Sequence, residues 1–520
     1  MINEQQKSET VATQPDNRRV WFAFIALMLT MLMSSLGQMI FSTALPTIVG
    51  DLGGVELMSW VITSFMLAQT IAMPIFGKLS DQLSRKYLLI GVIAVFVLGS
   101  VIGGFAQSMT TLIVARLIQG AAGGGLMILS QAITAEVVSA RDRGKYMGIM
   151  GAVFGVSSVL GPVLGGWFTD GPGWRWGLWL NVPLGLIAIA GIVYFLHNSG
   201  ARARVSVDVW GILTMAVATS SLILMCTWGG NTYEWSDPII IGLGICAAVF
   251  YPLFFFVERK VSNPLVPPSV FAIRNFNLTT LAGIATGVFM FGTLAYLPTY
   301  MQMVHMMSPT NAGLMMTPMM VGMLMTSTLV GNLVTRYGRY KWYPVVSMIG
   351  TFMAMVALSF MEPETPLWVV GIMLFVLGAV LGIGMQILVL IVQNSFSLDM
   401  VGTATAANNF FRQIGGTLGA ALVGGLFTGS LTDHLQEKLP AAIAQLPPEV
   451  QLQMAQGGGD FTERLTPAML THLPDVVQTA IQQSYSDALT PIFLLLSPLA
   501  LVAAVILAFV KEEPLKTEIA

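Results

Sequence analysis

Two arginines, Arg116 and Arg412, fall inside long apolar stretches of this 520-residue chain. An isolated cation in lipid costs several kcal/mol, so each guanidinium is expected to face the interior of a helix bundle or a water-filled cavity. There an arginine can bind an anionic ligand directly, or it can lower the pKa of a nearby carboxylate and so tune proton release. Glu136 is the carboxylate that we expect to act with Arg116. A structural arginine bonded to Gln119 is the alternative.

A second group of charged residues joins two apolar stretches in the run Gly77-Lys78-Leu79-Ser80-Asp81-Gln82-Leu83-Ser84-Arg85-Lys86. At a corner between two helices, Asp81 can accept hydrogen bonds from the N-terminus of a neighbouring helix or pair with Arg85. We expect Gly77, Asp81, Arg85 and Lys86 to form a latch that holds the protein in one state and breaks in the other. An ordinary solvated loop is the alternative.

Carboxylates that could carry a proton through the membrane are scarce. None of the 26 acidic residues lies near the middle of an apolar stretch, although a proton-coupled transporter normally places one there. The candidates for proton coupling are Arg116, Glu136 and Asp81, with Asp51, Glu56 and Asp399 as further alternatives.

Amide side chains within the apolar stretches are candidates for a ligand cavity. They are Gln38, Gln69, Gln119, Gln131, Gln386, Asn408 and Asn409, to which Arg412 is added. Eleven methionines lie between Met290 and Met325, and such flexible, polarizable side chains suit a surface that accepts ligands of many shapes. Lipid-facing packing is the alternative interpretation of the methionines.

The elements that position these residues are membrane-spanning helices. Hydrophobic residues make up 55% of the chain and charged residues 10%, against about 25% charged residues in a soluble protein. A water-soluble globular domain is therefore excluded, and runs of about 20 apolar residues predict an all-α integral membrane protein with fourteen transmembrane helices. They are expected near 20–42, 57–76, 87–106, 111–135, 146–168, 176–196, 208–227, 239–257, 276–300, 310–334, 344–361, 367–392, 402–427 and 487–510.

The placement of Lys and Arg predicts the orientation of these helices. With the N-terminus inside the cell, 19 of the 24 Lys and Arg residues fall in cytoplasmic segments, as the positive-inside rule requires. Both termini are therefore expected in the cytoplasm. The one long hydrophilic segment, 428–486, is expected to be an outer loop.

A repeat divides the chain into two halves. Gly77, Leu79 and Arg85 recur in register 254 residues later as Gly331, Leu333 and Arg339, and Gly331 and Arg339 are therefore assigned to a second copy of the latch. This pattern predicts a transporter of two related six-helix halves with two helices inserted between them. The expected parts are a tail (1–19), a first half (20–196), the inserted helices (208–257), a second half (276–510) that includes the outer loop 428–486, and a tail (511–520).

Several other functions lack their sequence signals. No GxxxxGK[ST] run is present, so ATP is not expected to drive this chain. The four histidines show no metal-ligand spacing and the two cysteines no disulfide framework, and we expect neither cofactor nor metal. No run of Lys and Arg with interleaved aromatics predicts a nucleic-acid partner. An enzyme embedded in the membrane would need a paired catalytic constellation, which we do not find.

Several of these runs resemble motifs of a known family. Gly77-x-Leu79-x-Asp81-x3-Arg85-Lys86 resembles the helix two/three motif of the major facilitator superfamily, and Arg116-x2-Gln119-Gly120 its helix-four motif. Gly155-x5-Gly161-Pro162-x2-Gly165-Gly166 is similar to its helix-five antiporter motif. Three further runs resemble motifs of the fourteen-span drug:proton antiporters of the QacA/EmrB type. They are Ser42-Thr43-Ala44-Leu45-Pro46-Thr47-Ile48, Trp174-Arg175-Trp176 with Asn181-Val182-Pro183-Leu184-Gly185, and Arg412-x2-Gly415-Gly416.

The resemblance implies a major facilitator fold and a secondary active exporter of hydrophobic or amphipathic compounds that exchanges them for protons by alternating access. Its setting would be a bacterial cell (inner) membrane, its partners small substrates, protons and lipids, and its state a monomer. Gly37 stands where the family commonly carries an Asp in the first helix, so the identity of the proton site is left open among the acidic candidates named above. A lipid or anionic-metabolite transporter of the same fold is the alternative.

Overall fold

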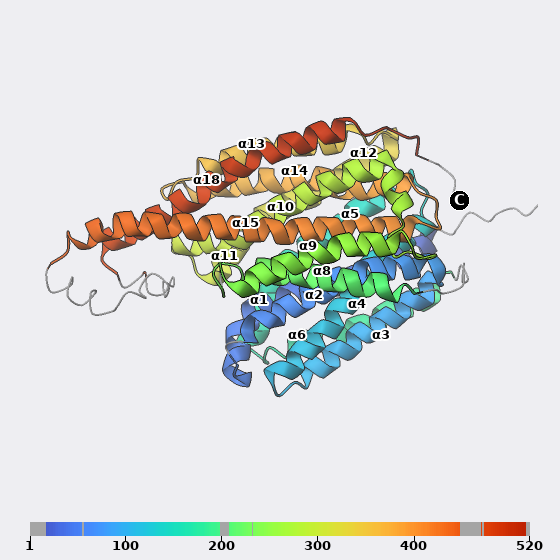
Figure 1. The fold of residues 1–520 in the computed structure, drawn as a ribbon, viewed down its shortest axis with the longest axis horizontal. Helices are drawn as coiled ribbons and strands as arrows, with labels where there is room; N and C mark the ends of the chain where they lie inside the picture. Colours follow the sequence, from blue (N-terminus) through green and yellow to red (C-terminus); the bar gives the residue numbers. More distant parts are fainter. Residues whose placement is uncertain are drawn as a thin grey trace, which may run out of the picture.

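A computed structural model of the chain describes residues 17–54, 57–197, 207–230, 232–447, 470 and 473–515. Over these ranges the chain is built almost entirely of helices (Figure 1). They are α1 (Asn17–Leu52), α2 (Met58–Gln82), α3 (Arg85–Gly104), α4 (Met109–Val137), α5 (Arg143–Asp170), α6 (Trp176–Trp179), α7 (Asn181–Phe195), α8 (Val209–Trp228), α9 (Pro238–Glu258), η2 (Pro268–Ala272), α10 (Arg274–Met303), α11 (Pro309–Leu314), α12 (Thr317–Tyr337), α13 (Trp342–Ser359), α14 (Leu367–Asn394), α15 (Val401–Ile443) and α18 (Asp475–Ala508).

Most of these helices are long enough to cross a membrane. Twenty residues at 1.5 Å each span about 30 Å, the thickness of the hydrocarbon layer. Thirteen helical segments of the described ranges meet the criteria of length and hydropathy, and α5, with 28 residues, runs beside α1, α12 and α14 as a further long helix. The prediction of an all-α multi-pass membrane protein is confirmed.

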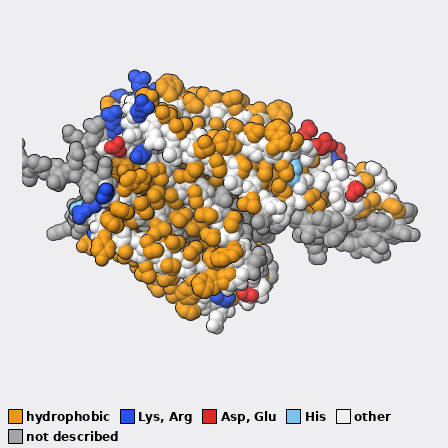
Figure 2. Space-filling view, turned by 180° about the vertical axis from the view of Figure 1, so that it is seen from behind, with side chains coloured by type: hydrophobic (Ala, Val, Ile, Leu, Met, Phe, Trp, Pro, Cys, Tyr) orange, Lys and Arg blue, Asp and Glu red, His pale blue; other side chains and the backbone are white. Residues whose placement is uncertain are grey.

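The surface agrees with a membrane setting. Figure 2 shows hydrophobic side chains over the middle of the bundle and most of the visible Lys and Arg at one end, which is the end of the C-terminus in Figure 1. The positive-inside rule makes this the cytoplasmic end.

Each half of the bundle has its own apolar core. Two clusters of buried side chains belong to α1–α7, and the largest cluster belongs almost entirely to α10–α18. The halves meet chiefly where α2 packs against α15 and α5 against α12, while α8 and α9 pair with each other and α8 lies against α2 and α15 (Figure 1). The latch residues can therefore contact the other half only where these helix pairs meet.

The segment 428–486 differs from the expected loop. α15 continues to Ile443 and α18 begins at Asp475, so both helices extend beyond the bundle (Figure 1). Leu435 and Leu439 of α15 and Val477 and Ile481 of α18 are buried in the same cluster, and Lys438 pairs with Asp487. The apolar residues at helical spacing let two hydrophilic helices stabilise each other outside the membrane. Residues 448–469 lie outside the described ranges.

The predicted C-terminal tail is held against the second half over residues 511–515. Lys511 and Asn275 exchange two hydrogen bonds of 2.9 Å, from Lys511 N to Asn275 Oδ1 and from Asn275 Nδ2 to Lys511 O. Glu512 Oε1 accepts a bond of 2.9 Å from Tyr340 N, just before α13 begins. These bonds tie the tail to α10 and to the start of α13. Residues 516–520 and the predicted N-terminal tail up to residue 16 lie outside the description.

Candidate functional site at the contact between the two halves

Asp81, in the last turn of α2, binds the N-terminus of α15 in the other half. Its Oδ1 accepts a hydrogen bond of 2.9 Å from Gly402 N and its Oδ2 one of 2.7 Å from Thr403 N. Oδ1 also accepts a bond of 3.0 Å from Arg85 NH2. The first N–H groups of a helix lack partners within it and carry a partial positive charge, so a buried carboxylate is well suited to this position. The contact joins residues more than 320 positions apart.

Arg85 uses its guanidinium to connect three segments. NH1 donates to Glu136 Oε2 at 3.0 Å and to Ala132 O at 3.3 Å, both near the end of α4. NH2 donates to Asp81 and, at 2.9 Å, to Leu398 O in the segment between α14 and α15. Only 3% of Arg85 is exposed. Two carboxylates and the carbonyls therefore compensate a cation that solvent hardly reaches.

The second copy of the motif, at the end of α12, makes an equivalent contact with the first half. Thr335 stands in register with Asp81, and its Oγ1 accepts a bond of 3.2 Å from Lys145 N. Lys145 is the third residue of α5, just as Thr403 is the third residue of α15. Arg141 adds bonds to the carbonyls of this corner, the shorter being 3.1 Å to Thr335 O. Each half thus caps the fifth helix of the other half, once with a carboxylate and once with a hydroxyl.

The latch glycines permit this close approach. A Cβ built on Gly77 would lie closer than 3.0 Å to Ala406 Cβ of α15, and one on Gly331 closer than 3.0 Å to Gly144 O of α5. Any larger side chain would push the helices apart. A Cβ built on Gly144, Gly148 or Gly151 of α5 would likewise lie closer than 3.0 Å to an atom of α12 or α14. A Cβ on Gly155 would lie 3.6 Å from its nearest neighbouring atom. The halves are packed most tightly at the cytoplasmic end.

Two further predicted latch residues lie apart from this contact. Lys86 Nζ donates to Val193 O at 2.8 Å and to Leu196 O at 2.6 Å, so it ties α3 to the end of α7 within one half. Arg339 is exposed, whereas Arg85 in the matching position is buried. The second copy of the motif therefore reproduces the helix cap but not the buried arginine.

The antiporter-motif residues lie along the outer part of α5. A Cβ on Gly161 would clash with Met39 of α1, whereas one on Gly166 would meet open space. Gly165 O accepts an intrahelical bond of 2.6 Å from Thr169 Oγ1. α5 continues as a helix past Pro162, whose side chain lies outside the description. These glycines thus include one close approach within the first half.

Arg116 is fully buried between two aromatic rings. Its Cζ lies 4.3 Å from the ring centre of Phe41 and 4.2 Å from that of Phe65, and NH1 donates to Gln119 Oε1 at 3.1 Å. Nε donates to Val61 O at 3.2 Å, while NH2 has no hydrogen-bond partner in the described part of the chain. Cation–π contacts with both rings stand in for a carboxylate.

The expected partnership of Arg116 with Glu136 is wrong. The two residues lie on one helix, α4, twenty positions apart, which is about 30 Å at 1.5 Å per residue. Glu136 pairs with Arg85 instead. Hydropathy places both residues on the same element, but it does not reveal how far along the membrane normal each one lies.

Arg412 belongs to a chain of buried polar groups that crosses between the halves. It donates to Asn409 Oδ1, and Asn409 Nδ2 donates to Gln131 Oε1 of α4 at 2.9 Å. Gln393 of α14 donates to Gln131 O at 3.3 Å. Gln393 is not among the residues predicted to line the cavity, because it stands at the end of a long apolar run where a polar residue is unremarkable.

The other cavity candidates differ in their surroundings. Gln69 and Gln386 are buried. The side-chain carbonyl oxygen of each has no hydrogen-bond partner among the described residues. Asn408 Nδ2 donates to Thr280 Oγ1 at 3.2 Å, and Gln38 is half-buried. Gln69 and Gln386 therefore keep an acceptor available for a ligand or a water molecule.

A profile of the Major Facilitator Superfamily matches residues 27–420. The chain belongs to the major facilitator superfamily. As a member it is a transporter and a multi-pass integral membrane protein.

Superfamily relatives match most of the chain. An uncharacterized MFS-type transporter of Mycobacterium tuberculosis is 38% identical over 95% of this chain and 69% of its own length. Multidrug resistance protein 3 of Bacillus subtilis is 33% identical over 95% and 96% of the two chains, and the multidrug transporter protein MdtP of the same organism is 32% identical over 88% and 87%. The solved structure of the proton:xylose symporter XylE has a TM-score of 0.61 at 14% identity, covering 96% of this chain and 97% of that chain. That likeness shows the fold.

The methionines of this superfamily member are divided between the core and the surface. Met301, Met319 and Met323 are buried in the core of the second half, and Met325 is 56% exposed on the outside of the bundle. Much of the methionine-rich region is therefore packing.

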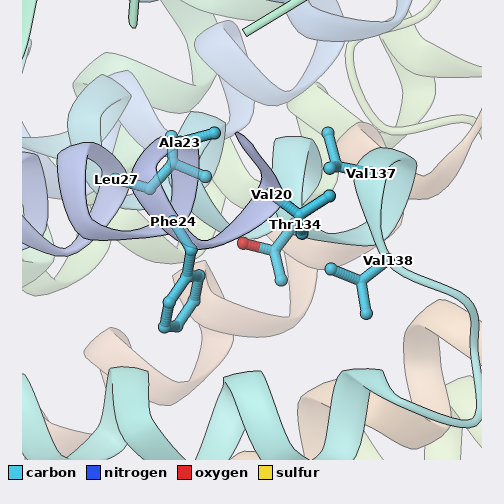
Figure 3. A pocket seen from close by; sticks show the side chains of 7 residues that line it. All are labelled: Val20, Ala23, Phe24, Leu27, Thr134, Val137 and Val138. Atoms are coloured by element: carbon cyan, nitrogen blue, oxygen red, sulfur yellow. The ribbon is translucent and has the colours of Figure 1, made fainter. Parts of the chain in front are cut away.

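A small cleft lies between the cytoplasmic ends of α1 and α4. Figure 3 shows it lined by Val20, Ala23, Phe24, Leu27, Thr134, Val137 and Val138. It has room for about one water molecule, and its only polar side chain, Thr134, already bonds Ser130 O. This cleft does not suit an amphipathic substrate.

The remaining acidic candidates have local partners or lie outside the description. Asp51 Oδ2 accepts a bond of 2.9 Å from Trp174 Nε1 and lies 3.6 Å from Arg175 NH1. Asp399 is exposed but has an interaction partner. Glu56 lies outside the described residues. Asp51 is thus engaged in holding the outer ends of the first half.

Proposed function

We propose that this superfamily member exports hydrophobic or amphipathic compounds from a bacterial cell in exchange for protons. The two Bacillus relatives are named for multidrug transport and resistance, which supports this class of substrate. The two related halves support alternating access, in which one end of the bundle opens as the other closes.

The observation that carries the proposal is the pair of helix caps between the halves. Asp81 of α2 caps α15 and Thr335 of α12 caps α5, and these two contacts hold the cytoplasmic end closed. An inward-open state requires both caps to break. Such contacts can act as a latch because their free energy belongs to one state only.

Asp81 and Glu136 remain our candidates for proton coupling, now as partners of Arg85, and Arg116 remains a separate candidate that does not act through Glu136. Asp81 and Glu136 both bond Arg85, so a proton on either would remove half of the negative charge that compensates this buried cation. Protonation of Asp81 would also weaken its bonds to the start of α15. We infer that proton binding at this cluster favours opening of the cytoplasmic end.

Purified protein in proteoliposomes with an imposed pH gradient tests the function. Cationic dyes, neutral drugs and fluorescent lipids are offered in turn, and we expect dye or drug transport that disappears when the gradient is collapsed. Arg339→Ala, at the exposed motif position, serves as the matched active control for Arg85→Ala. Equal transport with and without the gradient would refute proton exchange, and transport of lipids alone would refute drug export.

A lipid or anionic-metabolite transporter is the second candidate. Arg116 and Arg412 are buried, and neither forms an ion pair with a carboxylate in the described residues. A buried cation without a counter-charge would attract an anionic group. Uptake of an anionic dye or lipid in the same assay, lost in Arg116→Gln, would favour this candidate.

A further inference from the structure

The two inserted helices carry a pair of buried carboxyl groups at their cytoplasmic end. Asp208, directly before α8, is 7% exposed, and Glu258, the last residue of α9, is 2% exposed. Asp208 Oδ1 accepts a bond of 2.8 Å from Gly211 N, and Glu258 Oε2 one of 2.7 Å from Val266 N. One oxygen of each carboxyl group is thus fixed by the backbone.

The second oxygen of each group is left without a partner. Asp208 Oδ2 and Glu258 Oε1 are both buried and accept no hydrogen bond from the described residues. They face one small space over Gly211, because a Cβ built there would lie closer than 3.0 Å to both oxygens. The two side chains are near enough to share a hydrogen bond. As carboxylates, however, neither has a hydrogen to donate.

Burial makes two negative charges at this spacing unfavourable. Like charges that share a site disfavour each other's ionised form, and the low dielectric of the interior strengthens the repulsion. An unpartnered buried oxygen adds a desolvation penalty. A single proton between the groups removes one charge and supplies the missing hydrogen bond to both oxygens.

The charged groups around the pair do not replace that proton. On α2, Lys78 is half-buried and is near enough to Asp81 and to Glu258 for both charges to act on its ammonium group. Arg259 and Lys260, which follow Glu258, are exposed, and Lys260 Nζ lies 4.2 Å from the ring centre of Phe256. No cation of the described residues lies within ion-pair distance of either carboxyl group.

A metal ion suits this place poorly. α15 also packs against α8, and its buried cation Arg412 bonds Asn409 rather than either carboxyl group. In the described ranges no group of three or more His, Cys, Asp or Glu side chains could hold a metal. Two carboxyl oxygens over a glycine fit a proton better than a hydrated cation.

We propose that Asp208 and Glu258 form a proton-binding site outside the two six-helix halves and hold one proton between them. Loss of this proton would add a negative charge beside Lys78, three residues before Asp81 on the latch helix. The site would thereby connect protonation of the inserted helices to the contact between the halves. The use of the site in transport rests on the proposed proton exchange, but its existence does not.

Infrared spectroscopy of the full chain in lipid tests the site. Near neutral pH we expect a carboxylic-acid carbonyl band that shifts in D2O and that is lost in Glu258→Gln and in Asp208→Asn. Both amides keep an acceptor for the backbone N–H, so folding should be preserved. Gly211→Ala keeps both acids but fills the space between them, and it should weaken or shift the same band. A band unchanged in all three variants would overturn the proposal.

Asp237→Asn is the matched control. Asp237 caps α9 through a bond of 2.7 Å from Ile239 N, as Asp208 caps α8, but it is only half-buried and lies at the opposite end of the helix pair. The band should not respond to this change, and equal loss in the control would also overturn the assignment. The infrared result does not depend on transport. A band present in a protein that fails to exchange protons would therefore refute the proposed function while leaving the site intact.

Discussion

Replacement of Asp81 by Asn tests the latch most directly. Asp81 is 8% exposed and accepts two backbone N–H bonds from α15 and one from Arg85. Hydrogen bonds to a buried charged group contribute about 1.5–3 kcal/mol each, and breaking a buried ion pair costs about 3–5 kcal/mol. Asn keeps one acceptor, so we expect a net loss of about 3 kcal/mol, borne only by the closed state. This moves the equilibrium about 100-fold towards opening.

Distances between spin labels on the two halves measure this change. Tyr87, at the start of α3, and Tyr337, at the end of α12, are 61% and 62% exposed and can be replaced by labelled cysteines. The native Cys226 and Cys246 are first changed to Ser. We expect Asp81→Asn to enlarge a population with a longer distance between the labels.

A graded control separates the latch from a general loss of packing. Thr335→Val removes the equivalent cap, which is a single neutral hydrogen bond worth about 1 kcal/mol. It should shift the distribution in the same direction, but by less than tenfold. An unchanged distribution in Asp81→Asn, together with normal transport, would refute the reasoning. Equal effects of the two variants would show that the carboxylate has no special role.

Three further predictions concern other parts of the molecule. Arg85→Ala should destabilise the purified protein by about 3–5 kcal/mol, because two carboxylates lose their cation, while Arg339→Ala should leave thermal unfolding nearly unchanged; similar melting temperatures would contradict this. Glu512→Ala removes a bond to the segment before α13. It should lower the stability of the folded protein by about 1 kcal/mol, as loss of a helix cap does, without changing transport. A transport defect at normal stability would argue for another role. A single cysteine at Asp433 should react with an impermeant reagent from outside intact cells, and labelling only after permeabilisation would reverse the orientation.

Hydropathy along the chain was enough to predict the membrane class and nearly all of the long helices. Many apolar runs of about 20 residues are not compatible with a water-exposed chain. In lipid such a run forms a helix, because its backbone polar groups must be hydrogen-bonded within the helix itself. The corner around Asp81 could also be predicted, because its charged residues join two apolar stretches and part of the pattern recurs 254 residues later. The repeat at Gly331 further identified the part of the second half that mirrors this corner.

Helix ends and partners were decided by tertiary structure. α15 and α18 extend past the predicted ends because Leu435 and Ile481 lie in a shared cluster outside the bundle, and hydropathy measures suitability for lipid rather than pairing between helices. Glu136 binds Arg85 instead of acting with Arg116 because depth along the membrane and rotation about the helix axis place each side chain. Neither quantity is readable from a uniformly apolar run.

The candidate site depends most strongly on the folded chain. The Asp81 carboxylate accepts hydrogen bonds from the backbone N–H groups of Gly402 and Thr403. Backbone groups are the same in every residue, so the sequence gives no sign of this contact. Asp208 and Glu258 stand fifty residues apart at helix ends that look like ordinary polar boundaries. Only the pairing of α8 with α9 brings their two unpartnered oxygens over Gly211, because burial and proximity arise when helices pack.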